Sequence, residues 1–178
     1  MIDAPLHDED ARIAALRRLD VLDTSTEEPF EKIVTLVRTV LAVPIATVTL
    51  VDRDRQWFKA QRGLDCPATP RSGSFCTHTI QQRDPLVIED ALTDPRFAAS
   101  PLVVGPPHIR SYAGAPLRTP EGYNIGALCA MDTRPRAFSP ADVAILCNFA
   151  NIVCDELELR LMVIRSAAAE QRMRESVH

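Results

Sequence analysis

The sequence predicts an α+β fold, in which an antiparallel sheet carries helices on one of its faces. Two observations support this prediction: strand-like segments occur in two closely linked pairs, and amphipathic helical segments precede and follow them. At 178 residues the chain has the length of about one domain with a sizeable core. A long irregular segment separates the two strand pairs, and we expect it to cross the second face of the sheet.

Two helices are expected before the first strand. Residues 8–10 are acidic and begin the first helix, where the helix dipole favours negative charge, and an apolar stripe follows from Ile13 to Leu22. Residues 23–26 (Asp-Thr-Ser-Thr) interrupt this stripe and offer N-cap oxygens to a second helix. Pro44 should end that second helix.

Four segments have the composition of the main strands. Residues 45–51 are β-branched, and residues 56–62 follow them after a short polar turn, so these two segments should form an antiparallel hairpin. Residues 111–117 and 124–131 flank another short polar link and predict a second hairpin.

The segment between the hairpins is expected to be mostly irregular. Residues 64–74 are rich in Pro, Gly and Ser and predict a loop, whose final serine would cap a short helix over residues 75–82. A brief strand is expected at residues 86–89. Residues 90–107 then contain four prolines, with a possible helical turn at residues 95–97.

The last helix has the strongest start signal in the chain, with Ser139 as N-cap, Pro140 at the first position and Asp142 in the first turn. No helix breaker follows before His178. Apolar residues recur along it at near-heptad spacing, which predicts a helical dimer interface. The interface residues expected are Leu146, Val153, Leu157, Leu161 and Ile164. We expect residues 1–165 to form a sensor domain and residues 139–178 to form a dimerisation and signalling extension.

Charge and composition exclude several classes of protein. The net charge is −4, and no stretch is basic enough to follow a phosphate backbone, so no nucleic-acid partner is expected. No apolar run is long enough to span a membrane and the first residues do not form a signal peptide, so a cytoplasmic protein is expected. The five cysteines include no Cys-x-x-Cys pair, and no metal site is predicted.

A series of short motifs resembles the GAF domains that precede diguanylate cyclase or histidine kinase modules in bacterial signalling proteins. No single motif is specific, but their order and spacing together are. They are LDVLDT (19–24), VPIA (43–46), DRQWFK (54–59), SFCTH (74–78), DPRF (94–97), YAGAPL (112–117), IGALC (125–129) and DELELR (155–160).

The resemblance implies a GAF-like six-stranded antiparallel sheet, with the terminal helices on one face and a ligand pocket on the other, walled by the crossover between the hairpins. It also implies a homodimer through the terminal helices, which pass a signal to an output module such as a kinase or cyclase. No such module follows Arg160 in this sequence. We therefore expect a stand-alone sensor or the front part of a larger protein.

Eight residues are candidates for the ligand pocket because they lie in, or face, the expected crossover. They are Trp57, Phe75, Cys76, His78, Asp90, Arg96, Phe97 and Tyr112. Since Trp57 and Phe58 are adjacent in a strand, one should face the helices and the other the crossover. Asp90 and Arg96 are expected either to pair and hold the crossover, or to leave Arg96 free to recognise an anion.

Cys76 and His78 allow three interpretations: structural packing, lining of the pocket, or redox or covalent chemistry. Two residues on a helix that are two positions apart point in nearly opposite directions, so the pair is not expected to act together. In the related GAF domains that reduce methionine sulfoxide or attach bilins, the functional cysteines occupy other positions in the crossover than Cys76.

The sequence therefore predicts a non-enzymatic sensor domain that binds a small molecule and relays a signal through its helices. The ligand stays open between haem, bilin, an amino acid and a 2-oxo acid, so no cofactor is assigned. One alternative is a dimerisation scaffold without a ligand. Another is a thiol-dependent reductase of the methionine-sulfoxide type, with an exposed, low-pKa Cys76 and Cys66 as its resolving partner.

Overall fold

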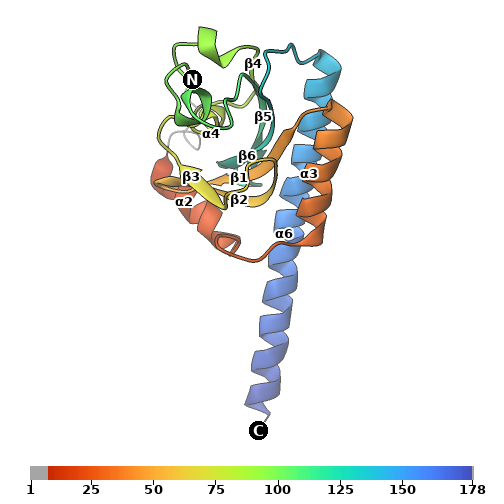
Figure 1. Cartoon of the computed structure of the whole chain (residues 1–178). Coiled ribbons are helices and arrows are strands. Elements are labelled where there is room, and N and C mark those ends of the chain that lie inside the picture. Colours follow the sequence, from red (N-terminus) through yellow and green to blue (C-terminus); the bar gives the residue numbers. More distant parts are fainter. Residues whose placement is uncertain (1–7, 178) are drawn as a thin grey trace.

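The computed structural model, which describes residues 8–177, is an α+β fold built on one six-stranded antiparallel sheet (Figure 1). The strand order is β3-β2-β1-β6-β5-β4. The strands are β1 (Ile45–Val51), β2 (Arg55–Arg62), β3 (Ala68–Pro70), β4 (Leu86–Ile88), β5 (Ser111–Arg118) and β6 (Asn124–Asp132). The helices are α2 (Glu9–Arg18), α3 (Glu28–Leu41), α4 (Phe75–Thr79), η1 (Ala91–Thr93, a 3-10 helix), α5 (Pro101–Val104) and α6 (Pro140–Ser176).

Both predicted hairpins are confirmed. Strand β1 pairs antiparallel with β2, and β5 pairs antiparallel with β6. The two hairpins join through the central pair β1–β6, so that the segment between β2 and β5 must cross from one edge of the sheet to the other. This crossover contains β3, α4, β4, η1 and α5, and it covers the face opposite the long helices.

The start of the second helix differs from the prediction. Helix α3 begins after Glu27, which makes no side-chain cap hydrogen bond, and residues 23–26 do not cap it. The helix begins later than these residues, and the buried Lys59 ammonium group binds to them instead, donating to the Thr24 hydroxyl at 2.9 Å and to the Ser25 backbone carbonyl at 2.6 Å. The helix ends at Ala42 in the left-handed region, φ 54°, two residues before Pro44.

The crossover also contains more regular structure than the sequence predicts. The expected loop of residues 64–74 includes β3, which pairs with the beginning of β2. Ser74 does cap α4, but that helix ends at Thr79, and the Asn124 side-chain amide donates to the carbonyls of Ile80 and Gln82 just beyond it. A helical turn is present at the expected residues 95–97, where the backbone N–H groups of Phe97 and Ala98 donate to the Asp94 carbonyl at 3.0 Å and 2.9 Å, and η1 and α5 lie on either side of it.

Helices α3 and α6 lie side by side over one face of the sheet, and α2 packs at its end (Figure 1). Among the described helices, none combines the length and the low charge needed to cross a membrane. The core beneath these helices is aliphatic, and its central members are Leu16, Val34, Val37, Val48, Leu50, Leu128, Leu146 and Val153.

This packing corrects the predicted dimer stripe. Leu146, Val153, Leu157 and Leu161 are at most 2% exposed, because they face the chain's own sheet and α3 rather than a second copy. Of the predicted interface residues only Ile164 is exposed. No described residue after Leu161 is buried, and the helix projects well beyond the body (Figure 1).

Replacing Leu157 by alanine should therefore destabilise the folded chain by about 2–5 kcal/mol, since a buried leucine is lost from the core. The matched control is Met162→Ala on the exposed side of the same helix, for which we expect a change within about 0.5 kcal/mol. Urea unfolding followed by circular dichroism measures both. Equal effects of the two substitutions would contradict the assignment of the faces of α6.

Candidate functional site

A stack of three aromatic rings fills the space between the crossover and the sheet. The Phe75 ring lies between those of Phe97 and Tyr112, with centroid distances of 4.5 Å and 4.8 Å and interplanar angles of 24° and 14°. All three side chains are buried in the second hydrophobic cluster, together with residues of α4, α5 and β6. The crossover face is therefore packed as a core at the position where a ligand pocket was predicted.

Polar atoms are concentrated at one end of this stack. The Tyr112 hydroxyl lies 2.8 Å from the Thr79 hydroxyl and 3.3 Å from the Cys129 sulfur. Gly114 makes this position possible, since a Cβ atom there would lie 2.1 Å from the Tyr112 oxygen. The Cys76 sulfur is 3.5 Å from the same hydroxyl and 3.3 Å from the Cys129 sulfur.

The rim of the cluster carries two charged or titratable groups. The His78 ring meets the Phe97 ring edge-on, with a centroid distance of 4.9 Å. The Arg96 guanidinium lies over the Phe97 ring, 5.1 Å from its centroid. Burial and the nearby positive charge of Arg96 lower the pKa of His78. Arg96 pairs with Asp94 at 2.8 Å.

The prediction that Arg96 pairs with Asp90 is therefore wrong. Asp90 instead accepts a hydrogen bond from the Leu92 backbone N–H at 3.1 Å and begins η1. Asp94 is two residues before Arg96 and also accepts its backbone N–H at 2.9 Å, so a local turn supplies the nearer carboxylate.

Of the eight predicted pocket residues, the structure brings four into one buried cluster: Phe75, Cys76, Phe97 and Tyr112. His78 and Arg96 lie at its rim, and Asp90 does not reach it. Trp57 is on the opposite side, in the aliphatic core beneath the helices.

Cys76 does not have the environment expected of a reductase thiolate. Its residue is 4% exposed, and the contact with Cys129 together with burial raises the pKa of the Cys76 thiol well above its ordinary value. The sulfur that touches it belongs to Cys129 rather than to the predicted partner Cys66. Cys66 instead lines a groove at the edge of β2. Among the described residues, no group of three or more His, Cys, Asp or Glu could hold a metal ion.

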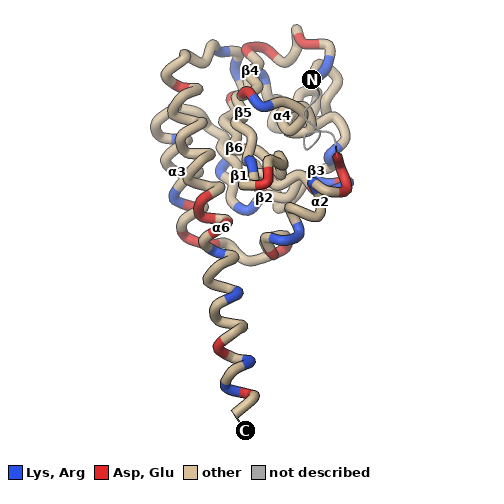
Figure 2. The backbone as a smooth tube through the Cα atoms, turned by 180° about the vertical axis from the view of Figure 1, so that it is seen from behind, with Lys and Arg blue, Asp and Glu red and all other residues tan. Residues whose placement is uncertain are grey.

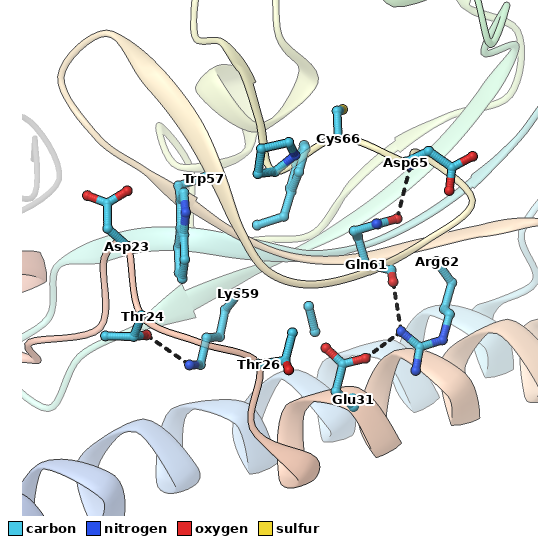
Figure 3. A pocket seen from close by; sticks show the side chains of 13 residues that line it. Asp23, Thr24, Thr26, Glu31, Trp57, Lys59, Gln61, Arg62, Asp65 and Cys66 are labelled. Atoms are coloured by element: carbon cyan, nitrogen blue, oxygen red, sulfur yellow. Dashed lines mark hydrogen bonds and ion pairs between the residues drawn. The ribbon is translucent and has the colours of Figure 1, made fainter.

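The groove lined by Cys66 is open, whereas the crossover face is filled by packed side chains (Figure 3). It has a volume of about 690 Å³ and runs along β2 where β3 no longer pairs with it. Its walls come from the α2–α3 connection, α3, β2 and the segment after β2: Asp23, Thr24, Thr26, Glu31, Trp57, Phe58, Lys59, Ala60, Gln61, Arg62, Asp65, Cys66 and Pro67.

An ion-pair network connects this groove to α6. The Lys59 side chain has no exposed surface, and its ammonium group donates to the Glu27 carboxylate at 2.5 Å. The same carboxylate accepts from the Arg160 guanidinium at 2.7 Å, and Arg160 also donates to the carbonyls of Leu19 and Asp20. Glu27 thus joins β2, the α2–α3 connection and α6 at the level where α6 leaves the body.

The charge on Glu27 is favoured in the folded state. Burial alone would raise its pKa, but the hydrogen bonds from Lys59 and Arg160 outweigh burial and hold the pKa below the ordinary value of 4.5. A carboxyl whose pKa is lowered on folding stabilises the fold above its unfolded pKa, and this contribution is lost as the pH falls through the folded pKa.

Sequence patterns did not identify four residues of these contacts: Lys59, Glu27, Arg160 and Cys129. Lys59 left one signal, because it is one of only two lysines and lies inside a strand-like segment among apolar residues. Its partner Glu27 is 32 residues away along the chain, and Arg160, the second partner of Glu27, is 133 residues from Glu27. No local pattern indicates either contact.

A comparison with known families matches the GAF domain model to residues 25–157. The chain belongs to the GAF domain family. It is 44% identical, over 147 residues, to a cyclic di-GMP phosphodiesterase of Pseudomonas aeruginosa, and the match covers 82% of this chain and 25% of that protein. The chain thus spans about a quarter of the length of this curated relative.

Solved structures share the fold. A domain of a protein described as a two-component sensor histidine kinase from Sinorhizobium meliloti has a TM-score of 0.60 at 19% identity, covering 84% of this chain and 99% of that one. The free methionine-R-sulfoxide reductase of Neisseria meningitidis also has a TM-score of 0.60, at 22% identity, covering 85% and 88% of the two chains. At these identities the likeness concerns the fold alone.

These findings contradict the prediction that the protein is not an enzyme. The relative at 44% identity is named as a phosphodiesterase, and the fold is shared with reductases. The prediction rested on the resemblance to GAF sensor domains and concerned this chain alone, which covers only a quarter of the relative. The prediction of a GAF domain of the kind found in bacterial signalling proteins is confirmed. The prediction that the protein is not an enzyme is wrong.

Replacing Glu27 by glutamine should destabilise the fold by about 1–3 kcal/mol at neutral pH, because the Lys59 ammonium group, which has no exposed surface, then loses its half-buried counter-ion. The difference from wild type should shrink as the pH falls below 4.5, where Glu27 of the wild type becomes protonated. Glu28→Gln is the matched control, since Glu28 pairs with Lys32 on the surface and should change stability by less than about 0.5 kcal/mol. Urea unfolding between pH 3 and 7 measures this, and a pH-independent difference would contradict the role of the charge.

Proposed function

We propose that this chain is a regulatory GAF domain that controls cyclic di-GMP turnover by an output module, to which helix α6 transmits the signal. The relative at 44% identity is named a cyclic di-GMP phosphodiesterase, and the match covers 82% of this chain. The activity of the whole protein is part of the proposal, since the matched segment is a quarter of that relative.

The observation that carries the proposal is the course of α6. The helix has 37 residues, of which those up to Leu161 pack on the sheet, while the described remainder projects from the body. Figure 2 shows that this projecting part carries both acidic and basic positions. A helix anchored at Arg160 and free beyond it is suited to pass a small rotation or shift to whatever follows or pairs with it.

A second copy of the chain is the proposed partner of the outer side of this helix. Leu159 and Val163 are 52% and 62% exposed and line a groove of about 350 Å³ shared with Pro29 and Phe30 of α3. Ile152 continues the same side of α6, seven residues before Leu159. Pairing of two such helices would cover these apolar side chains, which replace the stripe that the sequence suggested.

A small molecule is the proposed input. The groove along β2 has a volume within the usual range for ligand sites, and Lys59 on its wall bonds directly to the carboxylate that holds Arg160. A ligand that binds two arrangements of this network with different affinity would shift the population of α6 positions. No ligand class is assigned.

A dimerisation scaffold without a ligand is the second candidate, and the filled crossover face favours it. The stack of Phe75, Phe97 and Tyr112 occupies the predicted pocket. Native mass spectrometry of the purified chain distinguishes the two candidates. A bound small molecule, or a thermal shift with a metabolite that is lost in a Lys59→Met variant, supports the sensor; a bare chain unaffected by metabolites supports the scaffold.

The substitution Leu159→Glu should weaken self-association by roughly 30-fold or more, because a charge at the centre of an interface costs about 2 kcal/mol or more. Sedimentation equilibrium measures the dimer dissociation constant. The matched control is Val104→Glu, since Val104 is similarly exposed, at 61%, but lies on α5. A monomeric wild type, or equal effects of both substitutions, would overturn the proposed interface.

The regulatory role is tested by replacing the matched segment of the Pseudomonas aeruginosa phosphodiesterase with this chain. We expect the hybrid to hydrolyse cyclic di-GMP, and Leu159→Glu within it to change the turnover rate several-fold while Val104→Glu leaves it unchanged. A hybrid whose rate is the same with intact α6, with Leu159→Glu and with the GAF segment deleted would contradict control through this helix.

A further inference from the structure

Two cysteine thiols from distant parts of the chain touch inside the crossover core. Cys76 lies on α4 in the crossover and Cys129 on β6 in the middle of the sheet, and their sulfurs are 3.3 Å apart. A disulfide bond has a sulfur–sulfur length of about 2.05 Å, so the two atoms need to approach by only a little more than about 1 Å to bond. The sulfurs are already each other's neighbours.

The surroundings separate this pair from the other three cysteines. Cys66, Cys147 and Cys154 are partly exposed, and no contact joins them to another cysteine among the described residues. Hydroxyl groups surround Cys76 and Cys129: Tyr112 lies 3.5 Å and 3.3 Å from the two sulfurs, and Thr49 lies 3.9 Å from Cys129. These hydroxyls can donate hydrogen bonds to a thiolate within an otherwise apolar core.

We propose that Cys76 and Cys129 form a redox-active dithiol, which a hydroperoxide oxidises to an intramolecular disulfide that ties the crossover to the sheet. This site is independent of the proposed function, because it requires only the chain itself. Chains kept in reducing surroundings use such pairs transiently, for redox sensing or catalysis.

The chemistry involves two thiols and one hydroperoxide. The thiolate of one cysteine attacks the peroxide oxygen, the O–O bond breaks, and the released alkoxide or hydroxide takes up the thiol proton, which leaves a sulfenic acid. The second sulfur then attacks the sulfenic sulfur, the S–O bond breaks, and water departs with the second thiol proton. The two thiols lose two electrons and the peroxide gains them.

The order of attack follows from the positions of the two residues. Cys76 is on the covering segment and is 4% exposed, whereas Cys129 has no exposed surface. In the closed fold, burial and the contact with Cys129 raise the pKa of the Cys76 thiol and keep it unreactive. When α4 lifts, Cys76 loses both influences and its thiolate meets the oxidant, and Cys129 is the sulfur that resolves the sulfenic acid once α4 returns. Because α4 has only five residues and ends at Thr79, its local opening is the expected route of access.

Closing the bond would restrain the unfolded chain. The two cysteines are 53 residues apart, and a loop of this length lowers the unfolding equilibrium constant by up to about a thousandfold in the loop-entropy description. The oxidised crossover could no longer separate from β6. Oxidation would thereby fix the arrangement of the segment that covers this face of the sheet.

The test treats the reduced chain with hydrogen peroxide, alkylates the remaining thiols in denaturant and maps them by mass spectrometry. We expect the wild type to lose two of its five alkylatable thiols and two hydrogen atoms, with Cys76 and Cys129 in one linked peptide. Cys147→Ser, the matched control, should give the same linked peptide. Cys129→Ser should give none, and its Cys76 should react with dimedone as a sulfenic acid.

A second measurement separates slow access from wrong geometry. The reduced, unfolded chain is refolded in a glutathione redox buffer, so that the thiols are accessible while native proximity selects the pair. We expect the Cys76–Cys129 disulfide to predominate and to raise the urea midpoint of the wild type but not of Cys129→Ser. If neither route yields this disulfide, or if refolding gives another pair instead, the proposal is wrong.

Discussion

The placement of α3 and α6 against β2 depends on the burial of one charge, the Lys59 ammonium group. A cation without exposed surface is tolerated only where a counter-ion and hydrogen-bond acceptors reach it. Glu27 and the oxygens of the α2–α3 connection supply these, so the connection must pass beneath β2 and α3 must begin there. Since Glu27 also binds Arg160, the same requirement fixes the height at which α6 separates from the body.

The two faces of the sheet are stabilised by different kinds of packing. The helix face is an aliphatic core, whose side chains interlock along α3 and α6. The crossover face has fewer and larger side chains, and it depends on the ring stack and on the hydroxyl and thiol contacts at its end. Tyr112 can reach these contacts only across Gly114, so two residues of β5 determine how closely the crossover approaches the sheet. A smaller core of this kind, with polar contacts at one end, is expected to open locally at lower cost than the helix face.

Local patterns in the sequence were sufficient for the longer strands and for both ends of the domain, but not for β3, whose three residues lie within a Pro- and Gly-rich segment. The segments at 45–51 and 139–142 carry their own signals, namely β-branched composition and a capping box, and the structure has them at those positions. The face of α6 was assigned wrongly because near-heptad spacing is the same whether a helix packs on its own sheet or on a second copy. The Lys59 network and the Cys129 contact could not be predicted, since each joins residues that only the tertiary fold brings together.

The course of α6 explains how a domain with a filled interior could still transmit a change. Residues two apart on a helix point to nearly opposite sides, and this relation holds for Leu157 and Leu159 and again for Leu161 and Val163. One member of each pair is in the core and the other is exposed, so a shift of the core side chains must move the exposed side by the same amount. Because packed cores are not continuously deformable, such a shift is expected between discrete arrangements rather than as a gradual drift. The anchoring of α6 by Arg160 lies at the last turn before the helix leaves the body, where a small change in direction is amplified along the projecting length.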